Sequence, residues 1–520
     1  MIGAEHGSIP EHMTCDVAIV GTGAGAGITA ELLARAGLSV ILIEEGPLRS
    51  SSDFRQRESD AYPAIYQESA ARKTSDKAIN ILQGRCVGGS TTVNWTSSFR
   101  TPPSTLAYWR QTFGLKSLTD DALAPWFLQA ERRLNIGPWL LPPNENNELL
   151  RRGAATLGIP AATIARNVKG CWNLGSCGLG CPTNAKQSML VTTIPTALDH
   201  GAQLLVQTRA LTLEIVGERV IAMVCGQVLN DGSPASPATT RITAKHYVVA
   251  GGAINSPALL LRSNAHDPHG LLGTRTFLHP VVISAAIFNQ KVAGWSGAPQ
   301  TIYSDHFLGT APIDGPIGYK LEAPPMHPVI FASTLPGHGV EQAELLRQFP
   351  NTHSLLALMR DGFHPQAAGG NVSLRADGTP VLDYQLTDFI MDGARRAFHS
   401  MAEIQFAAGA SEVLPVHEMA KRYTSWPEAR TAIDALPMKP LLTRVVSAHV
   451  MGGCAMGATE RLGTVQPDGR HWHIDNLSVH DGSLFPTSIG ANPQLSVYGI
   501  VNMLATRLAK QLSGQDVQLA

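Results

Sequence analysis

The amino-acid sequence predicts an α/β protein of two domains, and three observations lead to this class. An apolar segment, 16–20, runs directly into a glycine-rich turn and then into a helix predicted over 28–36. A second apolar run, 40–43, ends at the carboxylate Glu44, so that strand, helix and strand form one parallel unit. The chain has 520 residues, which is more than one simple hydrophobic core usually holds.

The glycine-rich turn has the spacing of a dinucleotide-binding site. Gly21 permits the tight turn and Gly23 lets the backbone approach a pyrophosphate, while Ala26 stands where the pattern prefers a third glycine. The following helix N-terminus presents free N–H groups to phosphates, and Glu44 can hold a ribose diol. A glycine-rich turn in an ordinary strand–helix unit is the alternative. The strand, the helix and the acid together favour a nucleotide cofactor and a Rossmann-like domain.

Composition argues against two other classes of protein. The net charge is −1 and the isoelectric point is near 7.0, so no electrostatic footprint for nucleic acid exists. No segment approaches the roughly 18 apolar residues that span a bilayer, and residues 1–15 lack the apolar core of a cleavable signal. We therefore expect a cytoplasmic protein, or one peripheral to the membrane, that acts on a small molecule.

The rest of the chain alternates between strand and helix patterns. Residues 109–134 have helical spacing and predict one helix. A meander of strands that returns to the parallel sheet is predicted over 203–206, 211–216, 220–224 and 247–250. The tail, 477–512, predicts a strand, a turn and a long helix.

Four segments in order along the chain resemble the signatures of the glucose–methanol–choline (GMC) family of FAD-dependent oxidoreductases. They are the opening glycines with Glu44, the stretches 84–95 and 253–260, and the C-terminal pair 449–457 and 476–493. The resemblance covers essentially the whole chain. Within the family, 87–95 and 318–328 look most like the long-chain alcohol oxidase branch.

The resemblance implies FAD as the cofactor and a division into domains. A discontinuous FAD-binding domain would comprise 13–275 and 445–520, with a cysteine-rich loop inserted at about 167–187. Residues 276–444 would form an α+β substrate-binding domain on a mainly antiparallel sheet. The residues implied for the ADP half of FAD are Gly21, Gly23 and Glu44, those for the pyrophosphate and flavin ring are Gly88, Gly89, Ser90 and Asn94, and those for the ribityl–phosphate region are Asp481 and Gly482.

His449 and Asn492 match the active-site pair of the family. Alcohol oxidation removes the hydroxyl proton while hydride leaves carbon for flavin N5, and a neutral imidazole suits the proton transfer near pH 7. An amide cannot titrate, so Asn492 is expected to orient the substrate oxygen and to stabilise alkoxide charge. The expected reaction is FAD-dependent oxidation of a primary, fairly apolar alcohol to the carbonyl.

Three cysteines, Cys171, Cys177 and Cys181, lie in one short glycine-rich loop that ends in Pro182. Thiolates at this spacing could bind a three-iron (3Fe-4S) cluster, as in some GMC dehydrogenase subunits that work with a haem partner. A structural loop with free thiols or one disulfide is the favoured interpretation.

Other functions remain alternatives to alcohol oxidation. One is a non-redox lyase or a photodecarboxylase on the GMC scaffold. Another is the catalytic subunit of an electron-transfer dehydrogenase complex. An NAD-linked dehydrogenase is disfavoured, because Asp481 and Asn492 would have no role in it.

Overall fold

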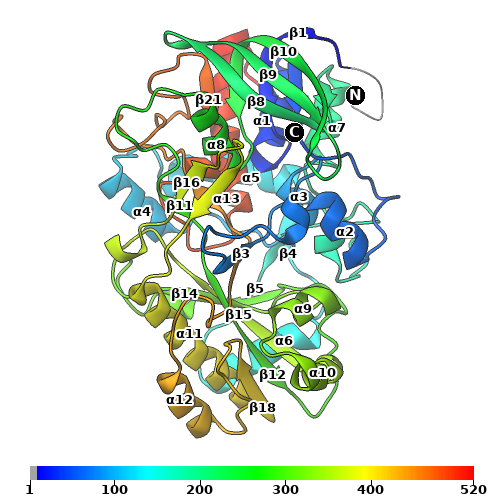
Figure 1. The fold of residues 1–520 in the computed structure, drawn as a ribbon, viewed down its shortest axis with the longest axis vertical. Helices are drawn as coiled ribbons and strands as arrows, with labels where there is room; N and C mark the ends of the chain where they lie inside the picture. Colours follow the sequence, from blue (N-terminus) through cyan, green and yellow to red (C-terminus); the bar gives the residue numbers. More distant parts are fainter. Residues whose placement is uncertain (1–8) are drawn as a thin grey trace.

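Two main sheets, one above the other in Figure 1, organise the protein. The computed structural model describes residues 9–520, so the expectation about a signal at residues 1–15 lies largely outside the described residues. Each sheet has its own apolar core. Among the described residues, no helix combines the length and the apolar character needed to cross a membrane.

The first sheet has a parallel centre. Its central strand β1 (His12–Val20) pairs in parallel with β2 (Val40–Ile43) and β10 (Pro234–Val249), and the parallel pairing continues to β7 (Gln203–Leu205) and β21 (Leu477–Val479). The first part of β10 also pairs antiparallel with β9 (Arg219–Val228), which pairs with β8 (Thr208–Val216). The predicted Rossmann-like sheet is therefore confirmed, and the returning meander consists of β8, β9 and β10. The segment 203–206, predicted as the first strand of the meander, instead contributes β7 to the opposite, parallel edge of the sheet.

Helices cover this sheet. Helix α1 (Ala24–Arg35) begins directly after the glycine-rich turn and contacts α7 (Thr193–Asp199) and α13 (Gln494–Ser513), which in turn contacts α5 (Asp120–Arg133). The prediction of one helix over 109–134 is wrong. The structure has α4 (Pro103–Thr112) and α5, separated at Gly114, whose φ of +68° ends the first helix. The Thr119 side chain then caps α5 by accepting from the Ala122 N–H at 3.1 Å.

The second sheet is mainly antiparallel, as predicted. Its strands in spatial order are β3 (Ile79–Ile81), β19 (Val445–Ser447), β12 (Val281–Ile287), β15 (Thr352–Met359), β14 (Tyr319–Glu322), β13 (Ile302–Ser304) and β5 (Ala162–Thr163), with β18 (Glu412–Pro415) also on β12. Only the β3–β19 pair is parallel among these. The helices packed on this sheet are α6 (Glu145–Thr156) and α11 (Asp388–Ala407), and α11 also contacts α12 (Trp426–Ala435). We propose the division into 13–275 with 445–520, and 276–444, with β3, β5 and β19 of the first domain crossing to the second sheet.

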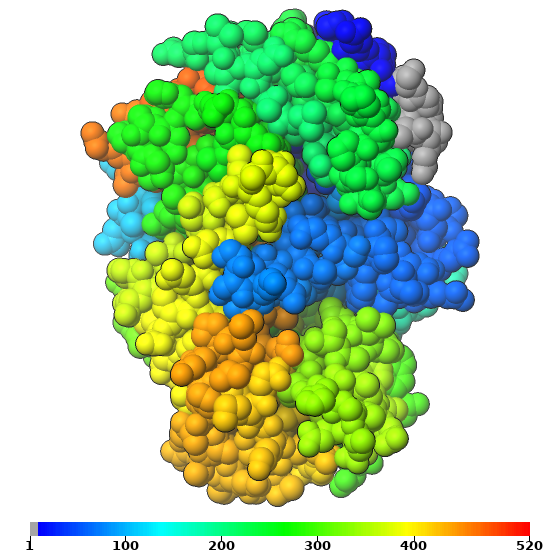
Figure 2. All heavy atoms as spheres, in the orientation of Figure 1, coloured from blue at the N-terminus to red at the C-terminus, as the bar shows by residue number. Residues whose placement is uncertain are grey.

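Shorter elements connect the two sheets. The remaining helices are α2 (Glu58–Ile65), α3 (Ser90–Val93), α8 (Asn255–Arg262), α9 (Pro328–Thr334) and α10 (Gly339–Arg347). Three small ribbons are formed by β4 (Ile136–Pro138) with β6 (Ala165–Asn167), β11 (Thr276–Phe277) with β20 (Met451–Gly452), and β16 (Asn371–Leu374) with β17 (Pro380–Asp383). In Figure 2 the blue part of the chain, before residue 100, crosses the middle of the visible face between the two halves.

Candidate active site

A cavity of about 860 Å³ extends from the glycine-rich turn after β1 to the segments that carry His449 and Asn492. Ten of the eleven residues assigned to catalysis or FAD line it: Gly21, Gly23, Glu44, Gly89, Ser90, Asn94, His449, Asp481, Gly482 and Asn492. Gly88 lies behind the wall, where its N–H donates to the Thr22 hydroxyl at 3.0 Å. The tertiary structure thus brings together segments from both ends of the chain.

The glycines leave room for a pyrophosphate. Gly21 has φ of +94°, and a Cβ there would lie 2.5 Å from the carbonyl oxygen of Ala250. A Cβ on Gly23 would meet no protein atom within 4 Å, so this position faces open space in the cavity. The free N–H groups at the start of α1 follow at once. These features fit the phosphates of a dinucleotide.

Glu44 is a buried carboxylate at the end of β2. Its Oε2 accepts from the Thr22 hydroxyl at 2.5 Å and its Oε1 from the Gly46 N–H at 2.8 Å. Burial raises the pKa of Glu44 to about 7, although both hydrogen bonds oppose the shift. Each carboxylate oxygen keeps a lone pair for a further donor, as a ribose hydroxyl requires.

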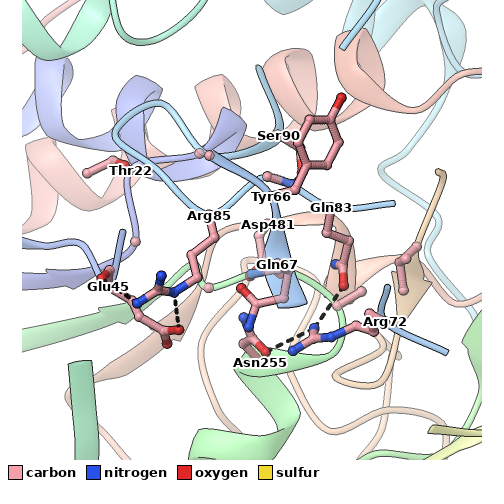
Figure 3. Close-up of a pocket in the computed structure, with 18 of the residues that line it drawn as sticks. Thr22, Glu45, Tyr66, Gln67, Arg72, Gln83, Arg85, Ser90, Asn255 and Asp481 are labelled. Atoms are coloured by element: carbon pink, nitrogen blue, oxygen red, sulfur yellow. Dashed lines mark hydrogen bonds and ion pairs between the residues drawn. The ribbon is translucent and has the colours of Figure 1, made fainter. Parts of the chain in front are cut away.

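The neighbouring Glu45 was missed by the sequence argument. It pairs with Arg85 at 2.8 Å and with Arg209 at 3.0 Å, and all three residues line the cavity. Burial alone would raise the pKa of Glu45, but the two guanidinium groups lower it to about 2. Figure 3 shows Arg85 directed at Glu45, and Arg72 between Gln83 and Asn255. The ion pair between Glu45 and Arg85 connects the end of β2 to the loop before α3.

Replacing Glu45 with glutamine is expected to lower the free energy of unfolding by about 2–3 kcal/mol, because Arg85, whose side chain is 7% exposed, loses its counter-charge. The folded-state pKa of Glu45 lies below its ordinary value of 4.5, so the ionised form stabilises the fold above that pH. The difference between wild type and variant should shrink as the pH falls from about 4.5 to about 2. Denaturant unfolding at several pH values measures it.

The matched control is Asp392→Asn, which breaks the exposed ion pair with Arg396 at 3.0 Å. This variant should change the free energy of unfolding by less than about 1 kcal/mol. Equal losses in the two variants would contradict the role given to Glu45.

The loop from Gly84 to Asn94 forms one wall of the cavity. The Ser90 hydroxyl accepts from the Gly84 N–H at 3.0 Å, just where α3 begins. Asn94 donates from Nδ2 to Oε1 of Gln494 at 2.6 Å, and Gln494 donates to the Ser97 carbonyl at 2.8 Å. Gln494, in the first turn of α13, was not predicted as a site residue. It connects the loop to the segment that carries Asn492.

The Asp481 carboxylate is engaged by its own surroundings. It accepts from the Gly252 N–H at 2.7 Å, from the Ser256 hydroxyl at 2.5 Å and from the N–H and hydroxyl of Ser483. Burial raises its pKa, and these bonds oppose the shift. Asp481 therefore anchors the turn before α8 to the segment after β21, and both segments line the cavity.

His449 follows β19 and pairs with a second histidine. Its Nδ1 lies 3.1 Å from Nδ1 of His279, and the rings stack at 5.3 Å. Burial lowers the pKa of His449 to about 4, and Lys320 adds to the shift; burial lowers that of His279 well below its ordinary value. Both rings are therefore neutral near pH 7. Two neutral rings share one proton across this Nδ1–Nδ1 contact. In the tautomer with that proton on His449, Nε2 of His449 is free to act as a base.

The position of His279 is itself supported. Its backbone N–H and that of Leu278 donate to the Asp361 carboxylate, each at 3.1 Å. Tyr384 donates to the same carboxylate at 2.8 Å. His279 has φ of +49°, which an L-residue rarely adopts, and this carboxylate holds the turn in place.

Asn492 contacts a buried acid that sequence reasoning missed. Its Nδ2 donates to Oε2 of Glu322 at 3.3 Å, and Gln300 donates to the same oxygen at 2.6 Å. Oδ1 of Asn492 is buried without a hydrogen-bond partner among the described residues. Glu322 lies in the segment 318–328. The sequence of this segment indicated the branch of the family, but it did not identify a site residue. Strand alternation places it on the same face as Lys320.

The three clustered cysteines are free thiols. Cys181 accepts from the Lys186 N–H at 3.5 Å, and Cys177 lies 3.7 Å from Nη2 of Arg166. Between residues 9 and 520, no group of three or more His, Cys, Asp or Glu side chains is arranged to hold a metal ion. Lys186 donates to the carbonyls of Thr92, Asn94 and Cys177. The loop thus supports the cavity wall through its lysine.

The fold and the cavity first define a class of protein. A Rossmann-like sheet whose glycine-rich turn opens into a cavity shared with an imidazole and an amide is the arrangement of a dinucleotide-dependent oxidoreductase. Two family models, both described as GMC oxidoreductase, match residues 62–281 and 365–500. The chain belongs to the GMC oxidoreductase family.

Relatives extend over nearly the whole chain. An uncharacterized GMC-type oxidoreductase of Mycobacterium tuberculosis is 31% identical over 509 residues, which cover 97% of this chain and 77% of that protein. A long-chain-alcohol oxidase of Arabidopsis thaliana is 28% identical over 507 residues, or 94% and 67% of the two chains. Pyridoxine 4-oxidase from Mesorbium loti shares the fold with a TM-score of 0.70 at 18% identity, covering 95% and 99% of the chains.

Proposed function

We propose that the protein oxidises a primary, fairly apolar alcohol to the carbonyl, with His449 as the base and Asn492 orienting the substrate oxygen. The observation that carries the proposal is that both side chains line the cavity that also contains the glycine-rich turn. Relatives named long-chain-alcohol oxidase, together with the low charged fraction of 16%, support an apolar substrate.

Each residue has a separate task in this proposal. In the tautomer that carries the shared proton on Nδ1 of His449, this nitrogen donates to His279, and Nε2 of His449 takes the hydroxyl proton. An N–H of Asn492 donates to the substrate oxygen as negative charge develops there. We further propose that the residues implied for FAD hold it along the cavity, with Gly21, Gly23 and Glu44 at the ADP half. When bound, FAD supplies the hydride acceptor.

The purified protein should show flavin absorption at about 380 and about 450 nm, and anaerobic addition of a medium- or long-chain primary alcohol should bleach it. Alcohols of increasing chain length, from four to twelve carbons by design, would give the length preference, with the matching alkane diols as polar controls. Bleaching by none of these alcohols would overturn the proposal and favour a lyase or a photodecarboxylase.

The same sample tests the alternative of an electron-transfer subunit. Cys171, Cys177 and Cys181 lie within one loop as free thiols, which is the observation that favours it, but their side chains are not arranged to hold a metal ion in the described part of the chain. Iron in the purified protein, with an absorption shoulder that survives bleaching, would establish a bound cluster and support this alternative. Iron-free protein that turns over alcohol alone would remove this alternative.

A further inference from the structure

Glu322 and Lys320 are two ionisable residues in the interior of the second sheet. Glu322 is 0% exposed and Lys320 is 2% exposed. Lys320 Nζ lies 3.3 Å from the ring centre of Phe99 and 4.2 Å from that of Tyr303. Isolated buried charges destabilise a core, and apolar residues of similar size would serve strand β14 at least as well. The pair therefore calls for an explanation outside the stability of the sheet.

The contacts of Glu322 lead toward the cavity. Its Oε2 receives hydrogen bonds from Asn492 and Gln300, both of which line the cavity, whereas its Oε1 is buried without a partner among the described residues. An ionised carboxylate only accepts hydrogen bonds, so it selects the amide nitrogen of Asn492 and excludes the amide oxygen.

We infer that Glu322 is a positioning residue that fixes the orientation of the Asn492 amide. The inference rests on the proposed function. One N–H of Nδ2 is held by Glu322, and the second N–H of the same nitrogen stays available for the alcohol oxygen. Rotation of the amide by 180° would place its carbonyl oxygen there instead, and that oxygen would repel developing alkoxide charge. Glu322 itself does not touch the substrate and acts through Asn492.

The charge of Glu322 makes this arrangement depend on pH. A protonated Glu322 could donate to Oδ1 of Asn492 and would favour the reversed amide. Lys320 and Arg166 are the cations that face Glu322, Tyr303 is a neighbouring phenol, and Gln300 and Asn492 are its neutral partners. Burial raises the pKa of Glu322, and Lys320 opposes the shift. The productive orientation is therefore present at higher pH and is lost as the pH falls through the pKa of Glu322.

The test compares wild type with Glu322→Gln in anaerobic flavin reduction by an alcohol across the pH range. A glutamine has nearly the same shape but can accept or donate, so it no longer selects the amide nitrogen. We expect reduction to be about 10- to 100-fold slower at high pH, as for a misplaced catalytic group, with bound FAD retained. The two profiles should converge at low pH, where wild-type Glu322 is protonated. The variant Glu322→Asp should keep the fall in the reduction rate at low pH and part of the wild-type rate at high pH.

A double-mutant cycle with Asn492→Ala separates positioning from a general structural effect. If Glu322 acts through Asn492, adding Glu322→Gln to Asn492→Ala should slow reduction by no more than about twofold further, well short of additivity. The matched control is Glu58→Gln, which removes a buried carboxylate that accepts from the Val329 and Ile330 N–H groups at 2.7 and 2.9 Å. This control should leave the pH profile unchanged.

Three results would overturn the inference: an undiminished rate in Glu322→Gln, a loss by the same factor at every pH, or additive losses in the double mutant. If Glu322→Gln did not retain FAD, the variant Glu322→Asp would take its place in the test. A reduction rate of Glu322→Asp that falls at low pH, as in the wild type, would support the inference, and a rate without this fall would overturn it. Failure of wild-type enzyme to bleach with any alcohol would overturn the proposed function instead. Wild-type bleaching with an unaffected variant would overturn only the inference.

Discussion

Replacing His449 with alanine is expected to leave FAD bound and to slow flavin reduction by an alcohol by about 10²- to 10⁴-fold, the usual contribution of a general acid or base. The imidazole lines the cavity, and its low pKa of about 4 keeps it neutral and able to take a proton at pH 7. Rapid-mixing absorption measurements under anaerobic conditions give the rate constant directly. The flavin-to-protein ratio shows whether cofactor binding is intact.

A second variant, His449→Asn, distinguishes proton transfer from packing. Asparagine retains a polar atom that can reach His279 but cannot take a proton at neutral pH. Both variants should therefore lose activity to a similar extent. The exposed His200, whose ring nitrogen Nδ1 lies 2.9 Å from the Thr196 carbonyl oxygen, provides the control His200→Ala, with no expected change. Full activity in His449→Asn would contradict the assignment of the base.

Replacing Gly23 with valine is expected to abolish FAD binding and to leave the apoprotein folded. The backbone of Gly23, at φ −71° and ψ −163°, is accessible to any residue, and a Cβ there meets no protein atom within 4 Å. The new side chain would occupy the space proposed for the pyrophosphate. Flavin content should fall to near zero, while the thermal unfolding temperature of FAD-free protein should change little. Calorimetry with and without added FAD measures both.

Gly25 provides the comparison. A Cβ at Gly25 would overlap the carbonyl oxygen of His480, so even Gly25→Ala forces the backbone of α1 and the segment after β21 apart. This variant should lower the unfolding temperature of the apoprotein itself. The two glycines stand two residues apart in one motif, yet one serves the ligand and the other the packing of the protein. A stable Gly25→Ala apoprotein together with an unstable Gly23→Val apoprotein would contradict this distinction.

Elements that depend on a continuous stretch of chain could be predicted. The strand over 40–43 and the strands between 203 and 250 follow from runs of apolar residues and the turns between them. The prediction of a single helix over 109–134 was wrong because the apolar spacing continues through a turn. There the left-handed Gly114 and the cap at Thr119 end one helix and begin another.

Some residues of the candidate site could likewise be predicted from a continuous stretch of chain, and others could not. Gly21, Gly23 and Glu44 could be named from a local motif. Glu45 stands beside Glu44 in the sequence but could not be distinguished from a solvated acid, because its partner Arg209 comes from a distant strand. The sequence does not distinguish Gln494 from an ordinary residue in the first turn of a helix. In the structure it lines the cavity and accepts a hydrogen bond from Asn94.

The sequence by itself determined the family, the glycine-rich turn and the positions of His449 and Asn492, because each of these depends on short segments whose residue order is sufficient. Only the tertiary structure decided which groups surround that pair. His279 lies 170 positions from His449, and Glu322 lies 170 positions from Asn492. Contacts over such separations arise when two sheets pack around one cavity, and no local periodicity relates the partners. The protonation and orientation of the site therefore depend on the packing of the whole chain.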